Sequence, residues 1–264
     1  MNRLIYAVAA IAIVAGIAVF LLNSPQPAQS LVDYDNVAVN STTMSRLYAI
    51  ANNQTLAATA TAVVKVITPA ANSTPLEYNG KPEVLYIGAE YCPYCASFRW
   101  GMALALMRFG NFSTLRYMTS SATDYAPSTP TFTFYNAPYS SSYIYFRPVE
   151  LTTNKLNATT NNYPPLQNMT PGEQVILQQN DPHGSVPFAD FGNASVALGS
   201  AFLPTLINGM TWGQIMSQIE QQDSPISQAI IGEANIYTAE ICREINNTAP
   251  VCSLPYVQII QKTQ

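Results

Sequence analysis

The sequence predicts a mixed α/β domain that carries a β-rich insertion and follows one N-terminal transmembrane helix. Three observations lead to this prediction. Residues 4–22 form an apolar stretch of 19 residues without a charge. Farther along, short apolar runs bounded by turn residues alternate with stretches of helical spacing. Between them, residues 122–150 are rich in Tyr, Thr and Phe, which favour strands.

The composition narrows the class of protein before any motif is considered. Only 10% of the residues are charged, against roughly 25% in soluble domains. Because 48% of the residues are apolar, the chain is not disordered through low hydrophobicity. A single long apolar run excludes a polytopic membrane protein, and a net charge of −4 without a Lys/Arg cluster argues against nucleic-acid binding. The composition therefore predicts a globular domain with a polar but uncharged surface.

The apolar stretch at residues 4–22 predicts an uncleaved membrane anchor. A helix of this length spans about 28 Å, close to the hydrocarbon core of a bilayer. A secretory signal peptide has a shorter apolar core, roughly 7–15 residues, and a small-residue cleavage site, which the following residues lack. Arg3 precedes the stretch, and the first basic residue after it is Arg46. By the positive-inside rule we expect a single-pass protein with a cytoplasmic N-terminus, an anchor at 1–23, a linker at 24–36 and an extracytoplasmic domain at 37–264.

Asn-x-Ser/Thr sequons are consistent with that location. Eight of them occur, at Asn40, Asn53, Asn72, Asn111, Asn157, Asn168, Asn193 and Asn246. They predict glycosylation of several asparagines on an extracytoplasmic surface. The alternative is that Asn and Thr only replace charged residues there. Because a neutral surface avoids net charge when carboxylates protonate, we also hypothesise that the outside medium is acidic.

Local patterns place helices and strands along the first half of the domain. A capped amphipathic helix is expected after Asn40, with Met44, Leu47 and Ile50 at helical spacing. Further apolar runs and helical patterns predict a helix or strand at 56–71, a strand at 83–88, a helix at 93–109 followed by Gly110 as its C-cap, and a strand at 115–120.

The second half begins with the insertion, which we expect at 122–182. Its many β-favouring residues are interrupted by Asn-Ala-Pro-Tyr-Ser, a turn signal. The expected elements are a hairpin or extended insertion at 122–150, a polar loop at 152–169, a helix start at Thr170 to Glu173, two strands joined by a Gly-Asn turn at 186–199, and helices beyond Thr211.

The sharpest motif is Cys92-Pro93-Tyr94-Cys95, which lies where a predicted strand turns into a predicted helix. Cysteines at this spacing on the first turn of a helix can close a small disulfide ring and exchange it with a substrate. Cys92 at the N-cap would have a stabilised thiolate, because the helix end supplies free N–H groups and partial positive charge. Pro93 suits the first helical position, and Cys95, one turn in, suits a shielded resolving thiol.

GKPEVLYIGAEYCPYC resembles the strand-to-active-site segment of thioredoxin-fold proteins, and its dithiol is typical of glutaredoxins. Thioredoxin-fold proteins carry a cis-proline facing the dithiol, at a position that Pro187 matches in VPFADFGN. The resemblance implies a thioredoxin-like fold with Cys92, Cys95 and Pro187 as catalytic residues, and Val186, Tyr91, Pro93 and Tyr94 in contact with the substrate. Tyr91 replaces the Trp common before a thioredoxin dithiol, and the insertion exceeds a minimal thioredoxin.

Over roughly residues 35–245 the chain also resembles an archaeal membrane-anchored family, the domain-of-unknown-function family 929. This resemblance rests on four segments, SRLYAIA, GAEYCPYCA, FRW and VPFADFGN. It points to the same fold, whereas the substrates of that family are not established.

Cys242 and Cys252 form the second cysteine pair. Outside the cytoplasm we expect a structural disulfide there, which would stabilise the fold by about 2–3 kcal/mol; a second redox pair or relay is the alternative. For Cys92 and Cys95 the alternatives are a structural disulfide or zinc, which also suits this spacing. Because His183 is the single histidine, we expect no metal, and no motif points to a cofactor.

Four residues near these motifs have two interpretations each. Glu90 could exchange a proton with the dithiol or be a solvated carboxylate. Arg99 could help to hold a thiolate or only cover the helix. For Trp100 we expect a core or interface position rather than catalysis. For His183 we expect an exposed loop rather than a place beside the dithiol.

These observations predict an extracytoplasmic, membrane-tethered thiol–disulfide oxidoreductase acting on secreted proteins. Cys92 would form the mixed disulfide, Cys95 would resolve it, and Val186-Pro187 would present backbone groups to the substrate. Thiol- or disulfide-containing proteins and a membrane redox partner are the expected partners; oxidation, isomerisation and reduction stay open. The alternative is a non-catalytic thioredoxin-fold binding or structural subunit of a membrane or cell-surface assembly.

Overall fold

The computed structural model describes residues 30–60, 67–72 and 74–263. In these ranges no helix is long and apolar enough to cross a membrane. The predicted anchor at 4–22 lies outside the described residues and stays a prediction. The short helix η1 (Leu31–Tyr34) falls within the predicted linker, and the Tyr34 ring lies 5.7 Å from Trp212. The folded domain therefore begins earlier than residue 37.

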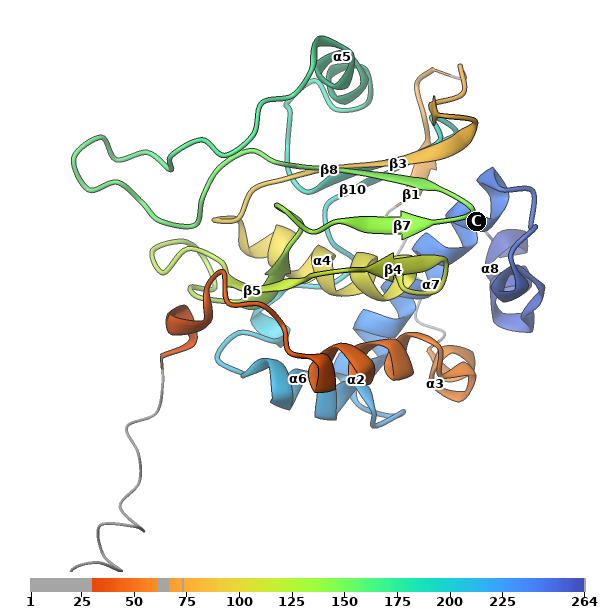
Figure 1. Cartoon of the computed structure of the whole chain (residues 1–264), viewed down its shortest axis with the longest axis horizontal. Helices are drawn as coiled ribbons and strands as arrows, with labels where there is room; N and C mark the ends of the chain where they lie inside the picture. The colour runs from red at the N-terminus through yellow and green to blue at the C-terminus, as the bar shows by residue number, and fades with distance from the viewer. Residues whose placement is uncertain (1–29, 61–66, 73, 264) are drawn as a thin grey trace, which may run out of the picture.

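Six strands form the central sheet (Figure 1). Their order is β1, β10, β9, β3 and β2, with β8 also paired to β3. β3 pairs with both β8 and β9; β8 runs parallel to it and β9 runs antiparallel to it. The strands are β1 (Ile67–Pro69), β2 (Glu77–Tyr78), β3 (Lys81–Gly88), β8 (Tyr145–Glu150), β9 (Phe188–Phe191) and β10 (Ser195–Leu198).

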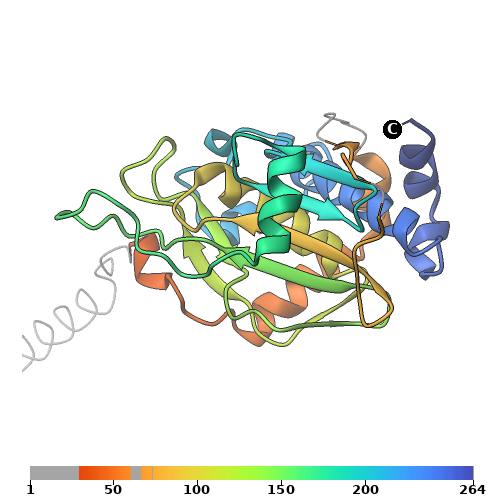
Figure 2. The ribbon, with the colours of Figure 1, turned by 90° about the horizontal axis from the view of Figure 1, so that it is seen from above.

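Helices cover both faces of this sheet (Figure 2). On one face, α5 (Pro171–Asn180) packs Leu177 against Leu85 and Phe188. On the other face, α4 (Pro93–Leu106) lies against α7 (Pro225–Glu244), with Phe98 and Tyr237 close to Tyr86. Every residue of α4 except Tyr94 is buried, so this helix is enclosed by the core. The remaining helices are α2 (Ser41–Ala51), α3 (Gln54–Thr59), α6 (Trp212–Ile219) and α8 (Pro255–Thr263), and the 3-10 turns are η2 (Pro204–Leu206) and η3 (Pro250–Ser253).

The strands between α4 and β8 correct the sequence-based prediction. The hairpin expected within 122–150 is wrong, because its runs pair with strands elsewhere: β6 pairs with β5, β7 with β4, and β8 with β3. Gly110 is not a C-cap, since α4 ends at Leu106 with Met107 as its C-cap, and Gly110 begins β4. A Cβ at Gly110 would lie 2.2 Å from Ser140 O, so this close pairing requires glycine. The strands are β4 (Gly110–Phe112), β5 (Arg116–Thr119), β6 (Pro130–Thr133) and β7 (Tyr139–Ser141).

Other local predictions are confirmed. Asn40 caps α2 by accepting from Thr43 N. Thr170 and Glu173 form a reciprocal capping box at the start of α5. β9 and β10 form the expected hairpin, with Gly192 and Asn193 at positive φ in its turn. Cys242 and Cys252 form a disulfide that joins the end of α7 to η3, as expected.

Candidate functional site

The dithiol lies where β3 ends and α4 begins. Cys92 is the N-cap of α4, and its sulfur accepts a hydrogen bond from Cys95 N at 3.2 Å. Both thiols are free; Cys92 is 6% exposed, while Cys95 is fully buried. Cys92 thus keeps a small exposed fraction at the first turn of the helix, whereas Cys95 has none.

The two thiols differ in acidity. A hydrogen bond from the Cys95 thiol, the Cys95 N–H and the positive charge of Arg99 hold the pKa of Cys92 below its ordinary value, despite burial. Burial and the neighbouring Cys92 sulfur raise the pKa of Cys95 well above its ordinary value. Of the two thiols, Cys92 is therefore the one that ionises first, and Cys95 keeps its proton to higher pH.

The Val186–Pro187 segment faces this pair. The Val186–Pro187 peptide bond is cis. Cys92 Sγ lies 3.8 Å from Val186 O, although the two residues are 94 positions apart in sequence. Val186 and Tyr91 pack against the small cluster formed by Cys92, Cys95 and Ala89. The structure therefore brings Tyr91 and Val186 together with the two cysteines.

A buried ion pair lies beneath the dithiol. Arg99 binds Glu150 through two hydrogen bonds of 2.8 and 2.6 Å, and both side chains have no exposed surface. Arg99 Nη2 also donates to Ala89 O at 2.9 Å, which places the guanidinium close to the cysteine cluster. Arg99 is thus not a surface cover of the helix. Glu150 was missed by sequence reasoning, because nothing local marks it as the partner of a residue 51 positions away.

Arg99 Nη1 and Tyr86 OH have no hydrogen-bond partner within the described part of the chain. Tyr86 is fully buried, and its hydroxyl lies over Gly88, where an added Cβ would come within 1.9 Å of it. Burial raises the pKa of Tyr86 well above its ordinary value, and both cysteines contribute to that rise. A free hydroxyl and a free N–H therefore lie near the thiols.

Glu90 is also buried, so its interpretation as a solvated carboxylate is wrong. It is 3% exposed, and Thr133 Oγ1 donates to Glu90 Oε1 at 2.6 Å. Burial raises the pKa of Glu90 to about 7, with Glu150 adding to the rise. Glu90 can therefore bind or release a proton in the neutral pH range, two residues before Cys92.

Two tyrosines adjoin the cysteines in sequence and two more stack on them, and we call these four the tyrosine rim: Tyr91, Tyr94, Tyr125 and Tyr163. The Tyr91 and Tyr163 rings stack at 4.3 Å with an interplanar angle of 4°. The Tyr94 and Tyr125 rings stack at 6.2 Å and 21°. Tyr125 and Tyr163 come from the predicted insertion and were missed by sequence reasoning, because ring stacking between distant loops leaves no local pattern.

Part of the chain matches a known family model. Residues 68–185 match the family model described as "Domain of unknown function (DUF929)". This match confirms the family resemblance over that segment. No curated protein and no solved structure matches the chain. The DUF929 segment contains the dithiol and the whole tyrosine rim, and it ends immediately before Val186.

The remaining sequence-based expectations divide. His183 is exposed in a turn, as expected. Of the sequons, seven asparagines are exposed, but Asn193 is 6% exposed and its Nδ2 donates to Thr74 O at 2.6 Å. Asn193 is therefore a poor glycan acceptor in the folded domain. Within the DUF929 segment Trp100 is fully buried, and its Nε1 donates to Pro130 O.

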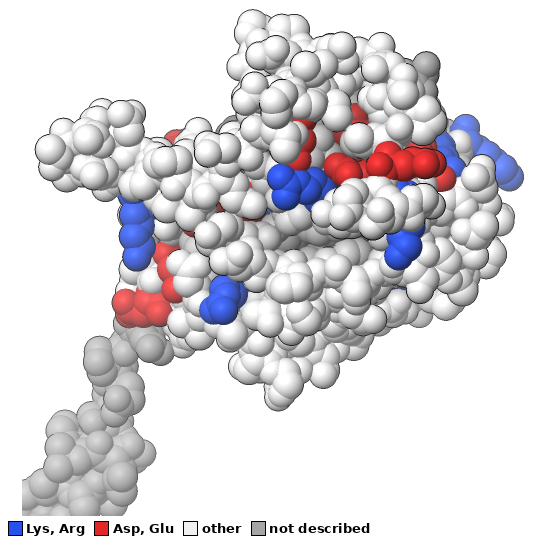
Figure 3. Space-filling view, turned by 45° about the horizontal axis from the view of Figure 1, so that its top comes forward, with Lys and Arg blue, Asp and Glu red and all other residues white. Residues whose placement is uncertain are grey.

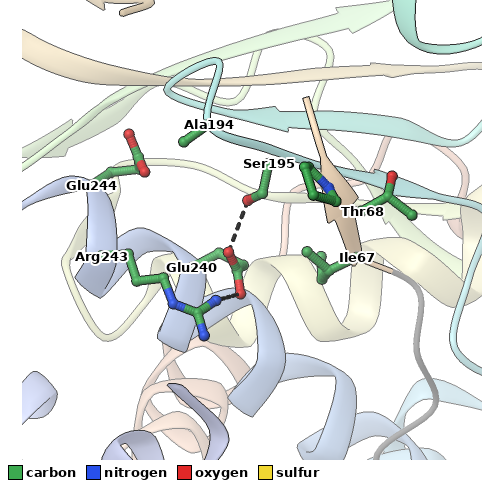
Figure 4. A pocket seen from close by; sticks show the side chains of 8 residues that line it. Ile67, Thr68, Ala194, Ser195, Glu240, Arg243 and Glu244 are labelled. Carbon is green, nitrogen blue, oxygen red and sulfur yellow. Dashed lines mark hydrogen bonds and ion pairs between the residues drawn. The ribbon is translucent and has the colours of Figure 1, made fainter. Parts of the chain in front are cut away.

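A pocket of about 480 Å³ lies elsewhere, between β1, β10 and α7 (Figure 4). Three of its polar side chains, those of Ser195, Glu240 and Arg243, are paired with one another. Ser195 Oγ donates to Glu240 Oε2 at 2.8 Å, and Arg243 binds the other oxygen of Glu240. Across the described ranges, no group of three or more His, Cys, Asp or Glu residues could hold a metal ion. This pocket therefore offers less reactive chemistry than the dithiol.

Proposed function

We propose that this protein is an extracytoplasmic, membrane-tethered thiol–disulfide oxidoreductase with a thioredoxin-like domain. The observation that carries the proposal is Cys92 at the N-cap of α4, with its pKa lowered and its sulfur 3.8 Å from Val186 O. The arrangement of β3, β8, β9 and α4 around this dithiol supports the thioredoxin-like fold. The DUF929 match does not indicate an activity, because the description of that family names none.

The reaction is a pair of thiol–disulfide exchanges. The Cys92 thiolate attacks one sulfur of a substrate disulfide, so a Cys92–substrate bond forms, the substrate S–S bond breaks, and a substrate thiolate leaves. Cys95 then loses its proton and attacks Cys92 Sγ. The Cys92–Cys95 disulfide forms, the second substrate thiolate leaves, and two electrons have passed to the substrate. Oxidation of a substrate is the reverse sequence.

Two neighbouring groups support the proton movements. Cys95 must lose its proton although burial raises its pKa. Glu90, with its pKa raised to about 7, can exchange that proton with solvent or the thiol, and Arg99 favours both thiolates. Thiol-containing secreted proteins and a membrane redox partner are the partners that this chemistry requires outside the cytoplasm.

The reactivity of the dithiol tests the proposal. We expect the described domain with its disulfide intact to catalyse insulin reduction or refolding of scrambled ribonuclease. Cys92→Ser should abolish this activity, whereas Cys95→Ser should accumulate mixed disulfides through Cys92. A reduction potential near −120 to −180 mV would indicate an oxidant or isomerase, and one near −270 mV a reductant.

Cys242→Ser with Cys252→Ser is the matched control, because it removes the distant disulfide and leaves the dithiol. This control should retain activity at a temperature where it is folded. If the folded wild-type protein neither exchanges disulfides nor traps partners as Cys95→Ser, the oxidoreductase proposal fails, and the non-catalytic subunit becomes the better description.

A further inference from the structure

Two loops enclose the turn that carries Cys92. They comprise residues 120–129 and 152–166, and both project from the side of the sheet where α4 begins (Figure 1). Glu90 N donates to Thr152 O at 3.0 Å, and Ser121 N donates to Tyr91 O at 2.9 Å. The loops are therefore attached by backbone hydrogen bonds to the residues that precede the reactive thiol.

The loops are also attached to each other through the tyrosine rim. Tyr163 OH donates to Ser121 Oγ at 2.8 Å, and the Tyr163 ring stacks on Tyr91. Tyr94 and Tyr125 remain 37% and 53% exposed while they stack on each other. Such rings offer a large contact area with few rotatable bonds, so they lose little conformational entropy on binding.

Charge is nearly absent from these loops. Residues 120–129 and 152–166 contain one acidic and one basic side chain, Asp124 and Lys155. In Figure 3 the surface of the projecting lobe is correspondingly mostly white. Contacts made here depend on rings and aliphatic groups, and they are little affected by salt.

We propose that the tyrosine rim is a docking surface for an extended polypeptide segment whose residues beside the reacting cysteine are aromatic or aliphatic. The proposal rests on the thiol–disulfide exchange proposed for Cys92. The occupant is a protein chain, because the partner of Cys92 must place a sulfur beside Val186 O, and its flanking residues then lie over Tyr91 and Tyr94. A charged segment would lose hydration at these rings and find few charges to replace it.

The test compares two peptides, each joined through its single cysteine to glutathione by a disulfide. One has Tyr and Leu around the cysteine, and the other has Glu and Lys. Glutathione disulfide serves as the small probe without a peptide. For each protein the second-order rate constant with either peptide is divided by the rate constant with glutathione disulfide.

For the wild-type protein we expect the Tyr/Leu ratio to exceed the Glu/Lys ratio about tenfold, with little change between low and high salt. Tyr125→Ala with Tyr163→Ala should bring the two ratios within about twofold. Tyr125→Ala alone, at an exposed position, should give an intermediate value, and Tyr163→Phe should retain the preference. Tyr78→Ala is the matched control, because this exposed tyrosine stacks on Tyr145 away from the dithiol.

Equal ratios for the two peptides in the wild-type protein, or an unchanged preference in the double variant, would overturn the inference. A preference for the Glu/Lys peptide would also overturn it. If glutathione disulfide reacts while the peptides are not distinguished, only the docking surface is rejected. If neither glutathione disulfide nor a peptide reacts, the proposed function is rejected, and the inference with it.

Discussion

The hydroxyls of the fully buried Tyr86 and the half-buried Tyr139 are in opposite situations. Tyr86 OH has no partner among the described residues, whereas Tyr139 OH donates to Leu106 O at 2.8 Å. A buried hydroxyl without a partner has lost its hydration without compensation, and one with a partner has replaced it. The two tyrosines therefore provide a matched comparison within one core.

We expect Tyr86→Phe to raise the free energy of unfolding by up to about 1 kcal/mol, and Tyr139→Phe to lower it by about 1 kcal/mol. Urea denaturation of both variants with the dithiol reduced would measure this. A loss of stability in Tyr86→Phe equal to that in Tyr139→Phe would mean that the Tyr86 hydroxyl is satisfied in solution.

The residues that sequence reasoning found are those with a local signature. Cys92 and Cys95 are marked by their spacing, and Pro187 by its place at the start of an apolar strand. Glu150 and Tyr163 carry no such signature, because each acquires its role from a partner on another segment, Arg99 and Tyr91 respectively. The charged residue Glu90 looks solvated in sequence, since its burial depends on β6 covering it.

At the scale of elements, the Arg99–Glu150 pair joins α4 to β8 inside the core. Removing one partner leaves an uncompensated buried charge. We expect Arg99→Met to lower the free energy of unfolding by about 3–5 kcal/mol, and Arg99→Met with Glu150→Met to recover most of this loss. Denaturation of the single and double variants at neutral pH would measure both effects.

The variant Arg99→Met with Glu150→Met also separates the effect of the ion pair on stability from its effect on the pKa of Cys92. It lacks the cation that lowers the pKa of Cys92, so its thiol should react with iodoacetamide at a higher midpoint pH than the wild-type thiol. The exposed pair Arg46–Glu220 offers the control: Arg46→Met with Glu220→Met should leave that midpoint unchanged. An unshifted midpoint in the Arg99 double variant would contradict the role of the guanidinium.

Elements defined by local chemistry were predicted, whereas strand partners were not. The cap of α2, the start of α5 and the β9–β10 turn all follow from residues within a few positions of one another. β8 instead pairs in parallel with β3, about 60 residues earlier, as Val84 opposite Phe146 illustrates. Parallel pairing across such a distance leaves no turn in the sequence to reveal it.

For the whole molecule, carboxylates with raised pKa values are distributed over buried and half-buried positions. Burial raises the pKa of Asp190 to about 6, of Glu90 and Glu244 to about 7, and of Glu233 to about 8. In each case the folded state holds a proton that the unfolded chain releases near its ordinary pKa. The resulting stabilisation is fully present below the unfolded pKa and is lost as pH rises through the folded value.

We therefore expect the thermal midpoint to fall as pH rises from about 5 to about 8.5. Glu233→Gln should flatten the upper part of this slope, because glutamine resembles the protonated carboxyl and does not titrate. Glu220→Gln is the control, since Arg46 lowers the pKa of the Glu220 carboxyl, which therefore titrates below this pH range. A midpoint that rises with pH would contradict both the burial effect and the expected suitability for an acidic medium.

The bend between β9 and β10 has a consequence for the timing of folding. Asn193 Nδ2, the atom to which a glycan would be attached, donates to Thr74 O once this bend has closed. A glycosyltransferase that meets the nascent chain can modify Asn193 only before that moment, whereas Asn40 stays exposed afterwards. Glycan occupancy at Asn193 relative to Asn40 would thus report how long the turn between β9 and β10 stayed unfolded in each molecule.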